Sequence, residues 1–459
     1  FSDELNNKFD FKERYATQQD SLEYLNYAAD ALDMHKDMRF ERRVTAAKYN
    51  ESEGQWNVEV ENGENYSCRF LVSASGLLSV PYKPPFKNSD SFKGQTYVTG
   101  NWPEEPVDFT NKRVAVIGAG ATAVQVIPIV AHEASQVTVF QRTPNYVLPA
   151  RNYPITDAHQ KEIRANRTQI FEKCRPQVFA FPMDDATKPL KDYSEEDRRR
   201  ILEWGWEVGG VRFTFETFSD LLTDRESNEI VAEFIREKIR SIVKDPATAE
   251  LMCPDYALFA KRPPLGHFYY EAFNRPNVSL VDVKNDPITE ITESGLKTRT
   301  REFSDFDIII YATGFDAGTG AIANIDVRGR GNQSVADAWS KSVETYLGIF
   351  MHGFPNFYMI SGPQAPFANT PMIIEKAVDL IGKSIGALYS SGNQVIEVKE
   401  EPCQQWAELI HGVLAATVLA DGAELHSWFL GNNISGKLST PLFHFGGANY
   451  YFDDLEKEV

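Results

Sequence analysis

A glycine-rich turn between an apolar strand and a helix restricts this chain to a small set of folds. Residues 113–117 read Arg-Val-Ala-Val-Ile, a pattern typical of a buried strand, and residues 118–123 read Gly-Ala-Gly-Ala-Thr-Ala. A helical pattern over 122–134 and a second apolar stretch over 136–141 follow, and together these segments make a β-α-β unit. Such units build a parallel sheet covered by helices, so we expect an α/β fold.

The spacing of small residues in this turn indicates a ligand as well as a fold. In a GxGxxA turn the first glycine permits the tight bend, the second lets backbone approach a pyrophosphate, and the third small residue lets helix and strand pack closely. The helix N-terminus then faces the anion. A bare glycine motif can be only a flexible turn, but the order strand, turn, helix, strand predicts dinucleotide binding by Gly118, Gly120, Thr122, Ala123 and Gln125.

The end of the second strand indicates which dinucleotide binds. An NAD site carries a carboxylate there for the ribose 2′-hydroxyl, whereas this chain reads Phe-Gln-Arg-Thr over 140–143. The planar guanidinium of Arg142 suits a 2′-phosphate instead. The alternative is a solvated surface arginine. We predict NADPH, with Arg142 and its neighbour Thr143 in the cofactor site.

Two further strands end in turns of small residues. Residues 70–76 read Phe-Leu-Val-Ser-Ala-Ser-Gly, and residues 308–316 read Ile-Ile-Ile-Tyr-Ala-Thr-Gly-Phe-Asp. Parallel sheets leave room for a ligand at the carboxyl ends of their strands. Alone, either turn could be structural. With the nucleotide turn between them they predict two linked, Rossmann-like dinucleotide-binding domains, with cofactor contacts from Ser75, Gly76, Ala312, Thr313 and Gly314.

Composition narrows the remaining possibilities. A chain of 459 residues needs more than one core, and its net charge of -18 argues against nucleic acid or an anionic membrane as a partner. No apolar run approaches the roughly 20 residues of a membrane helix. The four cysteines show neither CxxC spacing nor a histidine cluster, so no disulfide framework or metal site is indicated. We therefore expect a cytoplasmic protein with reduced thiols.

The segment just ahead of the nucleotide turn resembles the fingerprint of the Baeyer–Villiger monooxygenases, FxGxxxHxxxW. Phe92, Gly94 and Trp102 match it, while Val98 stands where the family has histidine. The resemblance covers essentially the whole chain in order, through residues 105–109, 140–144, 261–262, 269–275, 311–316, 362–364 and 427–428. It is therefore far more specific than any single motif.

The resemblance implies an enzyme with FAD and NADPH as cofactors and a small-molecule ketone and O₂ as substrates. Such an enzyme inserts one oxygen atom beside the ketone carbonyl to give an ester or lactone. Arg262 matches the active-site arginine, whose permanent charge can stabilise anionic oxygen intermediates. Lys261 resembles a second contact to the 2′-phosphate, and Trp428, followed by Lys437, resembles a mobile-loop tryptophan that closes over NADP. The matched flavin-lining positions are Thr17, Gln18, Val44, Ser75, Gly76 and Gln364.

The resemblance also implies three parts: a flavin domain from both ends of the chain, an NADPH domain in the middle and a helical insertion inside it. The insertion is rich in charge and helix formers, with Ser194 and Asp197 as a capping pair before 198–206. The predicted boundaries are 1–105 for the flavin domain, 106–149 and 259–316 for the NADPH domain, 150–258 for the insertion and 317–459 for the C-terminal part of the flavin domain.

Three departures from the family keep alternatives open. The fingerprint histidine is Val98, the loop before Lys261 reads Leu-Phe-Ala instead of Phe-Gly-x, and the family's first GxGxxG would precede Phe1. We therefore expect the flavin domain to be incomplete at its N-terminus. The rival functions are oxygenation of nitrogen or sulfur by a related enzyme, and a catalytically silent NADP-binding fragment. The sequence leaves the identity of the ketone and the oligomeric state open.

Overall fold

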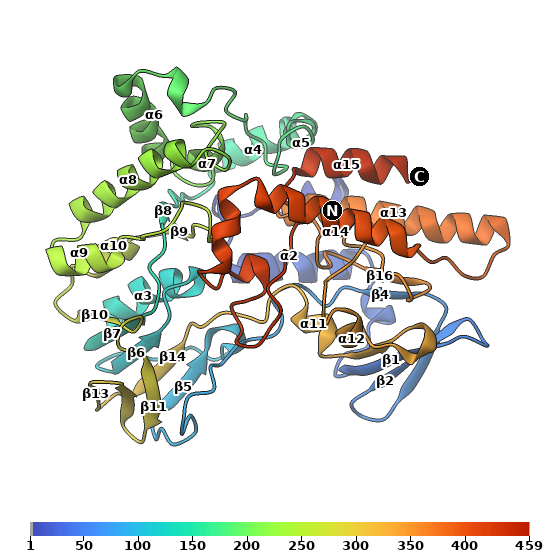
Figure 1. The fold of residues 1–459 in the computed structure, drawn as a ribbon, viewed down its shortest axis with the longest axis horizontal. Helices are drawn as coiled ribbons and strands as arrows, with labels where there is room; N and C mark the ends of the chain where they lie inside the picture. The colour runs from blue at the N-terminus through green and yellow to red at the C-terminus, as the bar shows by residue number, and fades with distance from the viewer. Residues whose placement is uncertain (1–2, 459) are drawn as a thin grey trace.

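A five-stranded parallel sheet forms the centre of the molecule in the computed structural model, which describes residues 3–458. Its order is β10-β7-β6-β14-β5, and each neighbouring pair is parallel. Figure 1 shows this sheet below a helical part and beside a second α/β part. The strands are β5 (Gln95–Val98), β6 (Arg113–Ile117), β7 (Gln136–Gln141), β10 (Val278–Asp282) and β14 (Ile308–Tyr311).

The predicted β-α-β unit is confirmed as β6, helix α3 (Ala121–Glu133) and β7. The strands are central because their residues are almost all apolar: three of the five residues of β6 have no exposed surface. Ala123, Val124 and Ile127 of α3 are likewise completely buried against the sheet. Burial of each of the larger side chains, Val124 and Ile127, stabilises the unit by about 2 kcal/mol. The predicted α/β fold class is thus observed.

The helical insertion packs beyond one end of this sheet (Figure 1). Ser194 caps its helix α6, since the serine hydroxyl accepts a hydrogen bond from the backbone N–H of Asp197, as predicted. The helix is longer than the predicted 198–206. The helices of the insertion are α4 (Asp157–Ala165), α5 (Arg167–Cys174), α6 (Glu195–Val208), α7 (Arg212–Phe215), α8 (Arg225–Ile242) and α9 (Pro246–Met252).

The second α/β part combines both ends of the chain, because β1 pairs with β15 and β4 pairs with β16, both in parallel. A hairpin turn joins β2 to β3 at Asn62-Gly63, a residue pair that predicts such a turn because both residues tolerate positive φ. The strands of this second α/β part are β1 (Val44–Asn50), β2 (Gln55–Val60), β3 (Asn65–Cys68), β4 (Leu71–Ser73), β15 (Asp326–Arg328) and β16 (Phe357–Met359). Its helices are α1 (Asp3–Asn6), α2 (Gln18–Ala31), α11 (Gly320–Ala323), α12 (Val335–Ala338), α13 (Thr370–Ser391), α14 (Glu400–Ala415) and α15 (Ala448–Lys457).

Two sequence predictions need correction. The alternating sequence of residues 66–73 predicts one strand, but the structure has two strands in different sheets, since β3 pairs with β2 and β4 pairs with β16. No glycine or proline stands at 69–70, so the pattern gave no sign of the break. The structure also places β5 in the nucleotide sheet, beside β14, although residues 1–105 were assigned to the flavin domain.

The remaining elements lie between β7 and β14 in sequence. A small antiparallel sheet, which the sequence did not predict, contains β11 (Ile288–Thr292), β12 (Gly295–Thr298) and β13 (Glu302–Phe303), while β8 (Leu148–Pro149) pairs with β9 (Leu265–Gly266) ahead of helix α10 (Tyr269–Ala272). Across residues 3–458, no helix combines the length and apolarity that crossing a bilayer requires. Over the same residues, no group of histidine, cysteine and acidic side chains is arranged to hold a metal ion.

Candidate cofactor site and active site

The glycine turn is shaped by close packing on one side and open space on the other. Gly118 has φ +123°, and a Cβ there would overlap the carbonyl oxygen of Ala312 at the end of β14. At Gly120, by contrast, a Cβ would meet no protein atom within 4 Å. Asn145 fixes the turn, because its side-chain amide donates to the carbonyl of Ala119 (2.6 Å). Gly118 is therefore needed by the fold, and Gly120 leaves room for a ligand at the N-terminus of α3.

A cavity of about 810 Å³ opens where β7 and β10 end, at the carboxyl edge of the sheet. Arg142 and Thr143 line it, as expected for residues that read the cofactor. Arg142 forms no hydrogen bond or ion pair with any residue in the described range. The other lining residues are Arg225, Asn228, Glu229, Asp255, Tyr256, Ala257, Val283, Lys284, Pro287, Asp421, Glu424, Leu425 and His426.

Lys261 adds a second cation close to Arg142. Burial and the neighbouring Arg142 guanidinium lower the pKa of Lys261 to about 8. Like Arg142, it has no carboxylate partner within residues 3–458. Two adjacent cations without an acid are electrostatically unfavourable alone, and an anion such as a phosphate would compensate both.

Arg262 follows on a loop that is held in an unusual backbone conformation. Phe259, at the position where the family has glycine, has φ +78° and is buried. The side chain of Asn228 fixes this loop through two bonds of 2.9 Å, to the N–H and the carbonyl of Leu258. Arg262 itself makes no ion pair within the described residues and is exposed, although partial desolvation by its surroundings lowers its pKa. The guanidinium is thus left free for a ligand, although the glycine of the family is absent.

A segment over 418–440, which we call the closing segment, completes the site. Its helical turns are η5 (Val418–Ala423) and η6 (Trp428–Leu430). Trp428 packs against Phe367 and Phe443, with ring centroids 5.9 and 5.1 Å apart, while its indole N–H has no partner in the described chain. Lys437 forms an ion pair with Asp316 and donates to the carbonyl of Ala317 at 3.1 Å. The segment is therefore attached to the turn that ends β14.

Comparison with known proteins identifies the family. Residues 4–165 match the model of the flavin-binding monooxygenase-like family. A Baeyer–Villiger monooxygenase from Pseudooceanicola batsensis is 42% identical over 452 residues, which cover 98% of this chain and 82% of the relative. The chain belongs to the Baeyer–Villiger monooxygenase family.

Two other similar proteins extend this result. The solved complex of OTEMO with FAD and NADP superposes with a TM-score of 0.94 at 38% identity, covering 99% of this chain and 85% of that one. Phenazine N-monooxygenase PhzNO1 from Lysobacter antibioticus is 36% identical over 452 residues, covering 98% of this chain and 83% of the relative. Family membership confirms the predicted class, an NADPH-dependent flavin monooxygenase, and FAD and NADPH as its cofactors.

The family fingerprint has a structural explanation in this Baeyer–Villiger chain. A Cβ at Gly94 would overlap both the carbonyl of Asp307 and the ring of Phe92, so only glycine lets β5 begin here. Phe92 and Val98 both pack against a cluster of buried apolar residues. Trp102 lies tilted against Tyr97, with centroids 5.3 Å apart. These residues fix the edge strand and the linker after it, and the histidine expected at Val98 is replaced by an apolar contact.

The residues predicted to line the flavin lie on several elements. Thr17 caps α2, and its hydroxyl is already bonded to Asp20, whereas Gln18 is exposed. Val44 begins β1, and Ser75 with Gly76 (φ +77°) follow β4. Gln364 is fully buried, and its side-chain amide bonds to Thr345 and Val343. Its backbone is also bonded within the fold, since the N–H donates to the carbonyl of Leu442 and the carbonyl accepts from the indole of Trp406, so the predicted flavin contact of Gln364 stays a prediction.

Ala312, Thr313 and Gly314 lie at the end of β14, as predicted, and face the glycine turn. Ala312 contacts Gly118, and Gly314 (φ +85°) has open space where a Cβ would lie. Thr122 and Gln125 lie in the first turns of α3, where the Gln125 amide donates to the carbonyl of Ala121. The structure therefore gathers the predicted nucleotide residues at one edge of the sheet.

Sequence reasoning missed the residues that surround Arg142. Arg225 and Asp421 form a bidentate ion pair (2.7 and 2.8 Å), and Lys284 pairs with Asp255 at 3.2 Å. The members of the first pair are 196 positions apart and carry no motif. Arg225 begins α8 and Asp421 lies in η5, so the two residues meet only in the folded chain.

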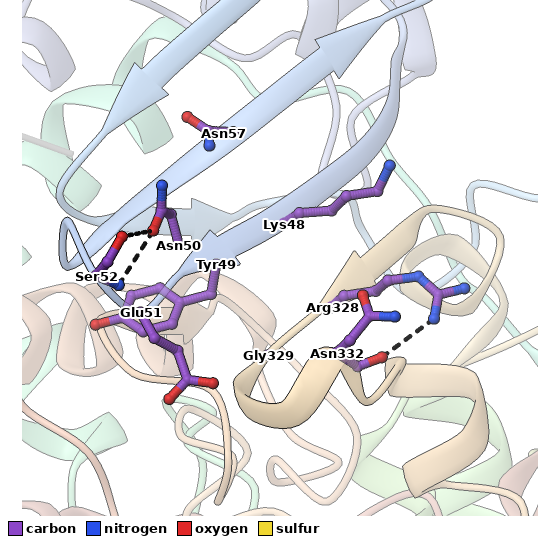
Figure 2. Close-up of a pocket in the computed structure, with 9 residues that line it drawn as sticks. All are labelled: Lys48, Tyr49, Asn50, Glu51, Ser52, Asn57, Arg328, Gly329 and Asn332. Atoms are coloured by element: carbon purple, nitrogen blue, oxygen red, sulfur yellow. Dashed lines mark hydrogen bonds between the residues drawn. The ribbon is translucent and has the colours of Figure 1, made fainter.

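A second pocket, of about 500 Å³, lies between the β1–β2 hairpin and the loop after β15 (Figure 2). Its polar groups are bonded among themselves: Arg328 donates to the carbonyl of Asn332, and Lys48 pairs with Glu59. Glu51 accepts from the backbone of Gly331 and pairs with Arg330. Because each charged side chain that lines this pocket already has a partner, the pocket has fewer free charged groups for binding a cofactor than the Arg142 cavity has.

Proposed function

We propose that this chain uses NADPH and FAD to insert one oxygen atom of O₂ beside the carbonyl of a small-molecule ketone, giving an ester or lactone. The observation that carries the proposal is the series Arg142, Lys261 and Arg262, three cations without acidic partners at the carboxyl edge of the nucleotide sheet. Arg142 and Lys261 hold the 2′-phosphate of NADPH. Arg262, next in the chain, then lies toward the reacting groups.

The chain's own residues bind and polarise, while the bound cofactors supply hydride transfer and oxygen activation. The open space at Gly120 and Gly314 accommodates the pyrophosphate backbone. The free indole N–H of Trp428 is a donor to the nicotinamide half of the cofactor. Arg262 keeps its positive charge at every accessible pH and stabilises the negative charge that develops on oxygen as the ketone is attacked.

A second candidate is oxygenation of a ring nitrogen, since one relative is a phenazine N-monooxygenase. Arg262 favours the ketone, because addition to a carbonyl places negative charge on the substrate oxygen, which a cation stabilises, whereas oxygen transfer to a neutral nitrogen places none on the substrate. A cytoplasmic location remains a prediction, supported by four cysteines that form no disulfide.

The decisive experiment compares wild type with Arg262→Ala in flavin-loaded protein. NADPH should bleach the flavin absorbance in both, while ester formation from cyclic ketones, followed by gas chromatography, should fall on the order of 10²- to 10³-fold in the variant. Arg262→Lys should recover part of this loss. Normal ester yield from Arg262→Ala, or N-oxide formation without ester in wild type, would contradict the proposal, and a folded protein that takes up no flavin would favour a silent NADP-binding chain.

A further inference from the structure

The cavity around Arg142 contains more acidic than basic side chains. Its cations are Arg142, Arg225 and Lys284, and its acids are Glu229, Asp255, Asp421 and Glu424. A phosphate with two negative charges would be repelled by such a lining, because unscreened charges a few ångströms apart interact strongly at a protein surface. The acids must therefore be neutralised before the cavity can accept an anion.

Ion pairs within and around the cavity neutralise three of these four acids, and the fourth, Glu424, is exposed to solvent without a cation partner among the described residues. Asp421 accepts two hydrogen bonds from Arg225, and this contact lowers the pKa of the Asp421 carboxyl. Asp255 pairs with Lys284, and Glu229 pairs with Arg236 from outside the cavity. Once these three pairs are formed, Arg142 is the lining cation that still lacks a carboxylate among the described residues.

The Arg225–Asp421 pair also joins two parts of the molecule, because Arg225 begins α8 and Asp421 lies in η5 of the closing segment. A backbone bond beside it joins the same two parts: the N–H of Val418 donates to the carbonyl of Leu222 at 2.9 Å. Val418 and Leu419 are themselves buried. The attachment therefore does not depend on the ion pair alone, so the pair is available for a second role.

We propose that Arg225 is a specificity-determining residue for NADPH, and that it acts by masking the carboxylate of Asp421 in the 2′-phosphate cavity. The inference rests on the proposed function, in which Arg142 reads that phosphate. Masking predicts opposite effects for the two partners. Loss of Arg225 exposes a carboxylate to the phosphate, whereas loss of the Asp421 charge removes an acid and frees a guanidinium with unused N–H donors.

The test measures binding of adenosine 2′,5′-bisphosphate and 5′-AMP to the full chain by titration calorimetry. Arg225→Met should weaken binding of the bisphosphate on the order of tenfold and leave 5′-AMP unchanged. Asp421→Asn should bind the bisphosphate at least as tightly as wild type, and the double variant should return to within about twofold of wild type. Arg240→Met is the control. Arg240 lies on α8, as Arg225 does, and forms a similar ion pair with Glu250 of α9, but it does not line the cavity.

The possible outcomes contradict, in turn, masking by Arg225, a role of Arg225 in specificity, and the NADPH assignment. If Arg225→Met, Asp421→Asn and the double variant all weaken binding equally, the pair is a clamp and masking is wrong. If Arg225→Met binds the bisphosphate as wild type does, Arg225 has no part in specificity. A wild-type chain that binds 5′-AMP but gains nothing from the 2′-phosphate would refute the NADPH assignment itself. Thermal melting of each variant shows whether a loss reflects unfolding.

Discussion

Arg142 is the residue that we propose selects NADPH over NADH. Its guanidinium lines the cavity without a carboxylate partner in the described chain. Replacing it by glutamate would put a negative charge where the 2′-phosphate binds, so Arg142→Glu should weaken NADPH binding on the order of a hundredfold. NADH, which lacks that phosphate, should lose little.

The measurement is cofactor affinity by calorimetry or fluorescence for both nucleotides. Arg275→Glu is a suitable control, since this arginine lies after α10 and outside the cavity. An equal loss for NADPH and NADH in Arg142→Glu would show that Arg142 acts on a part that the two cofactors share.

Lys261 should make NADP⁺ affinity depend on pH. Its pKa is lowered to about 8 from 10.5, mainly by burial, and only the protonated form attracts a phosphate. Affinity should therefore be greatest below pH 8 and fall as the pH rises above it. Because this folded-state pKa lies below the unfolded value, Lys261 also costs the empty protein stability at neutral pH, and that cost disappears as the pH rises from 8 to 10.5.

Calorimetry at about pH 9, repeated in two buffers with different heats of ionisation, would detect the linked proton. Wild type should take up a proton as NADP⁺ binds, since the phosphate restores the charge of Lys261, and Lys261→Met should take up none. Proton uptake that persists in Lys261→Met would assign the titration to another group.

At the scale of elements, the two glycines of the nucleotide turn should respond differently to the same substitution. Gly118→Ala combines a left-handed φ of +123° with overlap on the Ala312 carbonyl, so it should lower the free energy of unfolding by about 2–4 kcal/mol. Gly120→Ala meets no protein atom within 4 Å. It should keep wild-type stability yet weaken NADP⁺ at least about tenfold, because the methyl group takes space that the pyrophosphate needs.

Thermal melting and NADP⁺ titration of both variants test this contrast. Gly382→Ala supplies a control, since this helical glycine of α13 also has free space around a Cβ and lies in the other α/β part. Wild-type affinity in Gly120→Ala would place the pyrophosphate elsewhere.

The elements that sequence reasoning predicted are those whose signal is local. The β6-α3-β7 unit, the Asn62-Gly63 hairpin and the Ser194 cap each follow from a few adjacent residues. The break at 69–70 could not be predicted, because β3 pairs locally with β2, whereas β4 finds its partner nearly 300 residues away. Arg142 was predictable from its position at a strand end. The Arg225–Asp421 pair was not, because two distant elements form it only after folding.

At the scale of the whole molecule, the turn after β14 connects the separate parts. Ala312 contacts Gly118, the backbone N–H of Tyr82 donates to the carbonyl of Gly314 (2.9 Å), and Asp316 holds Lys437 of the closing segment. The turn after β14 therefore contacts the glycine turn, the linker between the α/β parts and the closing segment. Movement of any one of them should be transmitted to the other two.

The second α/β part also presents a surface that is unusually apolar for an exposed helix. Leu22 and Leu25 of α2 are 48% and 53% exposed, and Leu32, which follows the helix, is 55% exposed. In the described residues, β4 has a strand partner on one edge only, and Val72 on it is exposed. Uncovered leucines and an unpaired strand edge favour association.

We therefore expect the chain of 459 residues to associate reversibly as its concentration rises, despite the mutual repulsion of its negative charge. Leu22→Lys with Leu25→Lys should weaken this association at least about tenfold, since burying each leucine contributes about 2 kcal/mol. Ile129→Lys is the matched control, because Ile129 is 61% exposed on α3, in the other α/β part. Sedimentation velocity at several concentrations distinguishes the variants. If association survives the double change but is lost with Ile129→Lys, the surface that mediates association lies on the nucleotide domain.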